Sequence, residues 1–138
     1  MDREVIEQKL ESLRRCLQRV ADKCPPDPKT LRQDPDLQDI IALNLTRAVQ
    51  LCVDIGAHLI VGMEVPPPDT MGQTFDALAK AGVIPENLAM QLKKAVGFRN
   101  IAVHNYGEID WTIVHTIARH RLGDFTEFAK VIASRLAT

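Results

Sequence analysis

Apolar residues recur every three or four positions along almost the whole 138-residue chain. A helix with 3.6 residues per turn brings such positions onto one face, whereas a half-buried strand needs strict alternation, which no segment shows convincingly. The spacing therefore restricts the chain to helices that each bury one face. We predict an all-α fold, an up-down helical bundle of four main helices plus one short helix, with residues 1–138 in a single domain.

Prolines and polar caps predict the ends of the first helices. The first apolar stripe covers residues 6–24 and stops at Pro25, because the residue before a proline avoids the helical region. Residues 25–34 are expected to form a connecting loop. Asp34 is a good N-cap and Pro35 suits a first helical position, so a second helix, about 40 Å long, should start there.

The second half of the chain carries similar signals. The prolines at 66–68 end the long second helix, and Thr70 and Gln73 match a capping box for a short third helix that Gly82 ends. A fourth helix should then run from Pro85 to about Asn105. Asp110 is a natural cap for a fifth, which continues to residue 136 and is expected to kink near Gly123–Asp124.

Charge and composition exclude several classes of protein. The net charge is −1 and the pI is near 6.4. A protein that coats nucleic acid along its length is basic, so this class is excluded and any RNA contact must be local. Cys16, Cys24 and Cys52 form no CxxC pair and no zinc-ligand spacing, which predicts a reducing cytoplasm and no bound metal. No apolar run approaches the roughly 20 residues that span a bilayer, so no membrane contact is expected.

The fourth helix has more apolar surface than one bundle face can bury. At about 100° per residue, its apolar positions cover an arc of roughly 220°, and a surface helix needs little more than 100°. The apolar residues of this arc are Val96, Phe98, Ile101, Ala102 and Val103. Either the bundle engulfs this helix or a partner chain covers its remaining side. A homodimer is the simplest partner, because most small oligomers have two-fold symmetry.

Two side chains in this helix are candidates for chemistry. Arg99 lies near the middle of the arc, where a charge is costly unless it is paired. It either bridges to a carboxylate with its stem packed on apolar atoms, or it is held at an interface to bind phosphate. His104 lies about 140° from Arg99 on an ideal helix, so the two would not meet within one straight helix. As an isolated residue near the C-terminus of the helix, it also fits a capping role.

Other polar residues offer weaker signals. Asn100, four residues before His104, fits either a role in orienting the histidine ring or the phosphate, or a plain exposed position. His58, deep in the second helix, reads as a packed or partly exposed polar group. His115 and His120 lie in the last helix, where the basic run at 119–121 suits a solvated face better than an RNA groove.

The string Gly97-Phe98-Arg99-Asn100-Ile101-Ala102-Val103-His104-Asn105-Tyr106 resembles the motif of the HEPN superfamily, in which an arginine precedes a histidine by a few residues. The fuller form, Arg99-Asn100 followed by His104 and Tyr106, is similar to that of the HepT-like (DUF86) branch. The length, the long second helix and the final helix extend the resemblance over nearly the whole chain.

The resemblance implies a toxin of a toxin–antitoxin pair: a metal-independent RNase without a cofactor, whose cleft forms at a homodimer interface. By position, Arg99 and His104 become the catalytic pair, with Asn100 beside them. It further implies an MNT-type nucleotidyltransferase antitoxin that adds AMP to Tyr106, the only tyrosine of the chain. Two alternatives remain: a HEPN nucleotide-binding or partner subunit that cuts no RNA, and a purely structural dimerisation bundle.

RNA cleavage without a metal requires a base, an acid and a cation. The base takes the proton of the ribose 2′-hydroxyl, the cation stabilises the crowded phosphate, and the acid protonates the leaving oxygen. One histidine performs one proton transfer at a time, and the ordinary pKa of histidine, about 6.5, allows both forms at neutral pH. A symmetric dimer would supply two copies of His104 for the two transfers and two copies of Arg99 for the phosphate.

Overall fold

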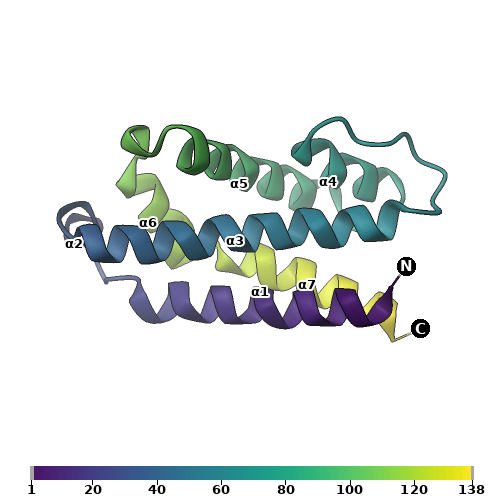
Figure 1. Ribbon diagram of the computed structural model, residues 1–138, viewed down its shortest axis with the longest axis horizontal. Helices are drawn as coiled ribbons and strands as arrows, with labels where there is room; N and C mark the ends of the chain where they lie inside the picture. Colours follow the sequence, from purple (N-terminus) through teal and green to yellow (C-terminus); the bar gives the residue numbers. More distant parts are fainter. Residues whose placement is uncertain (1, 138) are drawn as a thin grey trace.

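The computed structural model describes residues 2–137, which form seven α-helices and one short 3₁₀ helix and contain no strand. In chain order these are α1 (Arg3–Lys23), α2 (Pro28–Gln33), α3 (Pro35–Ile60), α4 (Met71–Lys80), α5 (Glu86–His104), η1 (Tyr106–Glu108), α6 (Trp111–His120) and α7 (Leu122–Leu136). The all-α prediction is confirmed, and the long helices run alternately up and down the bundle (Figure 1).

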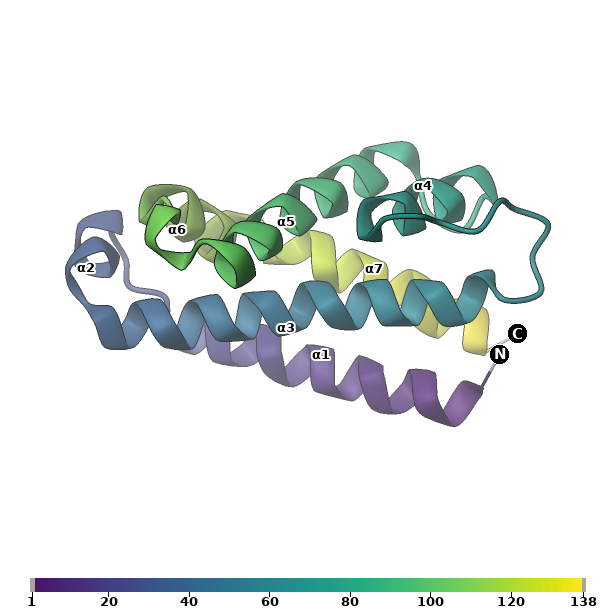
Figure 2. The same cartoon turned by 45° about the horizontal axis from the view of Figure 1, so that its top comes forward.

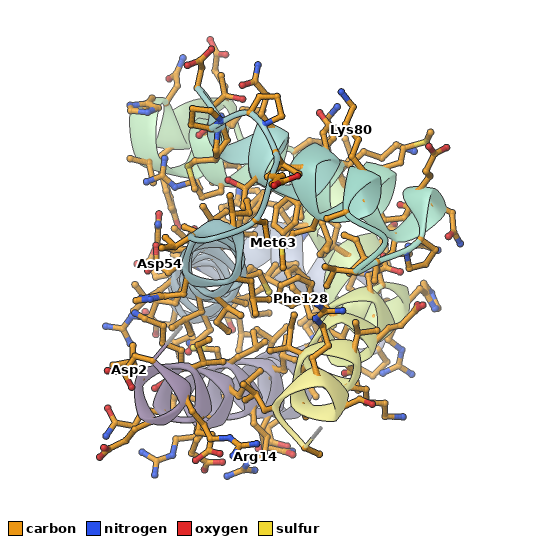
Figure 3. All side chains as sticks on the ribbon, turned by 90° about the vertical axis from the view of Figure 1, so that its right-hand side faces the viewer. Asp2, Arg14, Asp54, Met63, Lys80 and Phe128 are labelled. Carbon is orange, nitrogen blue, oxygen red and sulfur yellow. The ribbon has the colours of Figure 1, made fainter. Side chains whose placement is uncertain are left out.

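The long helix α3 occupies the centre of the bundle, with α1 on one side and α4 and α5 on the other (Figures 1 and 2). Both ends of the described chain lie at one end of the bundle, whereas α2, α6 and the C-terminal end of α5 lie at the opposite end. Seen along the bundle, Arg14 and Lys80 point outward and Phe128 lies among the helices (Figure 3). The core therefore runs along α3, and charge stays on the outside.

Helix α3 contacts all six other α-helices. Its length and hydropathy would also suit a membrane span, but just over half of its most apolar 18-residue window (56%) is buried inside the bundle. The predicted stripe is mostly buried, for example at Ile41, Cys52 and Ile55. Full burial of an isoleucine side chain contributes about 1.5–3 kcal/mol to the stability of the fold. The apolar character of α3 is thus explained by its place at the centre of a helical core.

The expected loop over residues 25–34 is wrong in part, because it contains the helix α2. Asp27 caps this helix: its carboxylate accepts a hydrogen bond from the backbone N–H of Thr30 at 2.8 Å. Pro28 occupies the first turn, where the missing N–H of a proline carries no penalty. The helix also buries Leu31 completely. The prolines around residue 25 indicated a break, but a proline after a good cap also begins a helix.

Two further helix ends differ from prediction. Helix α3 ends at Ile60, six residues before Pro66, and Gly62 follows with a positive φ of 88°, a conformation that favours glycine. The expected fifth helix is two helices, since Arg121 leaves helical geometry (φ −118°, ψ 6°) and separates α6 from α7. The break therefore precedes the expected kink at Gly123, and an ion pair of 3.1 Å joins Arg121 to Asp124 across it.

The predicted caps form in the structure. The backbone N–H of Gln73 donates to the Thr70 hydroxyl at 3.2 Å, while the Gln73 side-chain oxygen accepts from the N–H of Asp69 at 2.7 Å. The capping box therefore closes one residue earlier than its ideal form, which would use the N–H of Thr70. Asp34 and Asp110 cap α3 and α6 as expected.

The histidines outside the motif are structural or peripheral. His115 is buried, and its Nε2 lies 2.8 Å from the carbonyl oxygen of Pro25, which joins α6 to the segment between α1 and α2. The sequence analysis predicted only that His115 lies in the last helix, because no local pattern indicates a contact with a residue 90 positions away. His58 is half-buried, as predicted, and the run at 119–121 is exposed, as expected for a solvated face.

Candidate active site

The motif residues lie where α5 ends. The helix continues to His104, and Asn105 then leaves helical geometry (φ −153°, ψ 63°) while its N–H still donates to the carbonyl of Ile101 at 2.8 Å. Tyr106 begins η1 directly afterwards. These residues therefore lie at the end of the bundle away from the termini (Figure 1).

Burial along α5 changes abruptly at Phe98. The helix buries Leu88, Leu92 and Val96 against the bundle, and Phe98 is its last buried residue. Beyond it, the apolar side chains of Ile101 and Val103 are 45% and 50% exposed. The bundle therefore does not engulf α5, and the last turn and a half of the helix leaves apolar surface in contact with water.

Arg99 is half-buried at this boundary. Its Nη1 donates a hydrogen bond to the side-chain oxygen of Asn100 at 3.1 Å. Its Nε is the only buried side-chain nitrogen or oxygen among residues 2–137 that has no hydrogen-bond partner. No carboxylate of the described residues forms an ion pair with Arg99, so the alternative of a structural bridge is not what the structure shows. An unsatisfied buried donor costs about 1–3 kcal/mol.

His104 and Asn100 are both exposed. Within residues 2–137, the His104 side chain takes part in no hydrogen bond or ion pair, so it does not cap the end of α5. Asn100 pairs with its neighbour Arg99 and not with His104. Within residues 2–137, Arg99 thus donates to Asn100, His104 is open to solvent, and no hydrogen bond joins the arginine to the histidine.

Tyr106 is fixed by contacts from two other helices. Its hydroxyl donates a short hydrogen bond to Asp39 Oδ1 on α3, and its ring meets Trp111 of α6 edge-on at 5.7 Å between centroids. The side chain is nevertheless 42% exposed. The pKa of Tyr106 is raised above its ordinary value, mainly because the side chain is partly buried. The hydrogen bond to Asp39 and the negative charge of that carboxylate raise it further. Asp39 was missed by the sequence analysis, since no local pattern marks it.

A separate groove of about 600 Å³ runs between α5, α6 and α7. Its lining is largely apolar and includes Phe98, Ile101 and Ile113, but neither Arg99 nor His104 contributes to it. The described residues hold no group of three or more His, Cys, Asp or Glu side chains that could bind a metal. The candidate site is therefore the surface around Arg99, His104 and Tyr106.

Comparison with known sequences identifies relatives over nearly the whole chain. The family profile described as Ribonuclease HepT-like matches residues 4–132. The chain is 36% identical over 129 residues to the mRNA nuclease HepT of Shewanella oneidensis, covering 94% of this chain and 96% of the relative. It is also 28% identical over 102 residues to the tRNA nuclease HepT of Aphanizomenon flos-aquae, covering 73% and 69% of the two chains.

Solved structures agree with the sequence comparison. The tri-AMPylated HEPN toxin of Shewanella oneidensis, in complex with an MNT antitoxin, superposes with a TM-score of 0.88 at 36% identity, covering 97% of this chain and 99% of that one. The cytosolic protein YutE of Bacillus subtilis has a TM-score of 0.84 at 22% identity, covering 99% and 91%, and shows a likeness of fold alone. The arrangement of helices is thus shared by both proteins.

The contact with Asp39 predicts how Tyr106 titrates. Because Tyr106 is the only tyrosine, the absorbance of tyrosinate against pH reports its ionisation alone. We expect the midpoint well above the ordinary value of about 10. In Asp39→Asn the midpoint should fall toward that value without reaching it, because burial still opposes the charged form. Asp36→Asn, one turn earlier on α3, should leave it unchanged. A wild-type midpoint at the ordinary value would contradict the contact.

Proposed function

We propose, from the premise that this chain belongs to the ribonuclease HepT-like family, that it is the RNA-cleaving toxin of a toxin–antitoxin pair and acts without a metal ion. Arg99 and His104 carry the reaction, and Asn100 holds Arg99. The observation that carries this proposal is the buried Nε of Arg99, which has no hydrogen-bond partner within residues 2–137, on a side chain that donates to Asn100. The guanidinium has further N–H donors beyond Nε, and these can bind the oxygens of an RNA phosphate.

The chemistry follows from what these side chains can do. Arg99 binds the phosphate and stabilises the charge that develops when the ribose 2′-hydroxyl attacks it. His104, exposed and without a partner among the described residues, is open to exchange protons with substrate. A neutral His104 takes the hydroxyl proton and a protonated copy gives a proton to the leaving oxygen. The reaction therefore requires two histidines in different protonation states.

A homodimer supplies the second set of groups. The end of α5 leaves Val103 half exposed beside Arg99, and Leu43, one turn after Asp39 on the same face of α3, is also 50% exposed. Packing these apolar side chains against a second copy would remove them from water. It would also bring two copies of Arg99 and His104 together at the symmetry axis. We propose that this interface forms the cleft for RNA.

The antitoxin acts on Tyr106. The Shewanella toxin carries AMP groups and binds an MNT antitoxin, and here Tyr106 is the only tyrosine. Its hydroxyl lies near the motif on a side chain that is 42% exposed, so an enzyme can reach it. An added AMP places a negative phosphate beside the site, where it competes for Arg99 and repels RNA. We propose that residues 1–138 act as one domain in the cytoplasm, with RNA and this nucleotidyltransferase as partners.

The catalytic assignment predicts that Arg99→Ala and His104→Ala each lower the rate of RNA cleavage by about 10²–10⁴-fold, as expected on loss of a phosphate ligand or a proton-transfer group. Purified variants are compared in the presence of EDTA, which should leave the wild-type rate unchanged. Arg119→Ala and His120→Ala, a matched exposed pair in the last turn of α6, should cut normally. Wild-type rates in both motif variants would overturn the assignment, and lost helicity would indicate a structural role.

The dimer proposal predicts that Val103→Glu dissociates the protein, because a charge in an apolar seam is costly without a partner. Light scattering at micromolar concentration should give about twice the chain mass of 15.4 kDa for the wild type and about that mass for the variant. Val61→Glu, which changes a 74% exposed residue at the end of α3, is the matched control and should stay dimeric. A monomeric wild type would refute the proposed interface.

The proposed modification predicts a mass gain that depends on one residue. Co-expression with the nucleotidyltransferase should raise the intact mass of the wild type by one or more AMP units and abolish cleavage. Tyr106→Phe should show no such gain and should keep much of its cleavage activity, because only the hydroxyl is lost. If the gain persists in Tyr106→Phe, the acceptor is another residue. If the wild type shows none, the antitoxin acts by a different route.

A further inference from the structure

The hydrogen bond between Tyr106 and Asp39 joins residues that lie 67 positions apart in the sequence. Asp39 is an exposed residue in the second turn of α3, and among residues 2–137 it is the only partner of the Tyr106 hydroxyl. Trp111 contacts the tyrosine ring from α6. The hydroxyl is thus held at one point by three elements of the fold while its side chain remains accessible.

From this contact, we propose that Asp39 is the general base for the addition of AMP to Tyr106, so that the toxin supplies part of the machinery of its own modification. The inference rests on the proposed function, in which Tyr106 accepts AMP. It adds a catalytic residue to the acceptor side of that reaction.

The step is balanced. The Tyr106 oxygen attacks the α-phosphorus of ATP, and an O–P bond forms as the bond from that phosphorus to the bridging oxygen of pyrophosphate breaks. The proton of the hydroxyl passes to Asp39 Oδ1, with which it already shares a hydrogen bond, and then to water. Pyrophosphate leaves with the electron pair of the broken bond. Nothing is oxidised or reduced, and ATP is the only co-reactant.

The chemistry of a phenol explains why a base is needed. A tyrosine with an ordinary pKa of about 10 is almost entirely protonated at neutral pH and is a weak nucleophile in that form. The surroundings of Tyr106 raise its pKa further, which leaves still less phenolate before the reaction. The proton must therefore leave during the attack. General base catalysis requires an acceptor within hydrogen-bond reach, and Asp39 is the group that meets this condition.

The Asp39 carboxylate would also repel the AMP group once it is attached to Tyr106. Once the oxygen is bonded to phosphorus, it has no proton to donate and the hydrogen bond to Asp39 is lost. The phosphodiester then carries a negative charge beside a negative carboxylate, and like charges at this separation repel. The modified side chain would leave Asp39 and swing its AMP group away from α3, toward the neighbouring end of α5.

The experiment follows AMP addition over time by intact mass, with the purified protein, ATP and its proposed MNT-type nucleotidyltransferase partner. Asp39→Asn keeps a side-chain oxygen that can accept the hydrogen bond but cannot take the proton. We expect it to be modified about 10²-fold more slowly than the wild type, as for other lost general bases. Asp39→Ala should be equally slow, and added formate should restore part of its rate. Asp36→Asn, the matched loss of charge one turn away, should be modified normally.

Several outcomes would overturn the inference. Modification of Asp39→Asn at the wild-type rate would show that the carboxylate takes no proton, and a slow Asp39→Ala beside a fast Asp39→Asn would assign Asp39 a positioning role only. Both results leave the proposed function intact, because Tyr106 still accepts AMP. An absence of any mass gain in the wild type would instead overturn the proposed modification and this inference together. Since Asp39 is exposed, unchanged helicity and melting temperature of the variants serve as the control for folding.

Discussion

The burial of α3 is the constraint on which the rest of the structure depends. All six other α-helices contact this one helix, and each must present an apolar face to it. Two of these faces meet directly where Phe75 of α4 packs edge-to-face on Phe128 of α7, with ring centroids 6.0 Å apart. Helix α5 is left partly uncovered at its C-terminal end, where Ile101 and Val103 are 45% and 50% exposed.

The uncovered end of α5 explains why the candidate site lies where it does. Burial stops at Phe98, and the next residue is an arginine whose Nε is out of water yet unpaired. A buried N–H without a hydrogen-bond partner, such as the Nε of Arg99, destabilises the fold by about 1–3 kcal/mol. In the proposed complex, a phosphate or the second chain would offset this cost. The proposed homodimer would cover this apolar surface and would bring the Nε of Arg99 and the exposed His104 to one interface.

Local signals in the sequence predicted most of the fold. Proline positions and capping residues located the helix ends, because these effects act within one turn of the chain. Prediction failed where one residue type is compatible with two local structures. A proline can end a helix or begin one, and Pro28 begins α2 inside an expected loop. The break at Arg121 comes two residues before Gly123, the residue that indicated a kink in this region. The excess apolar surface of α5 was correctly predicted from helical geometry alone.

Contacts between distant segments could not be predicted in this way. The bonds from Tyr106 to Asp39 and from His115 to Pro25 span 67 and 90 positions and depend on how the helices pack. The motif residues themselves were found through a family resemblance, because helical geometry places Arg99 and His104 on different sides of α5. Their separation within one chain is the reason that a shared site is central to the proposed mechanism.

The most direct test of this account is the activity of a defined heterodimer. One wild-type chain and one chain carrying both Arg99→Ala and His104→Ala bear different affinity tags, and the mixed dimer is isolated by two successive purifications. If both chains build one site, the heterodimer should cleave RNA at about a hundredth of the wild-type rate or less, because half of its proton-transfer groups are gone. Cleavage at half the rate of the wild-type homodimer would show that each chain acts alone and would contradict the account.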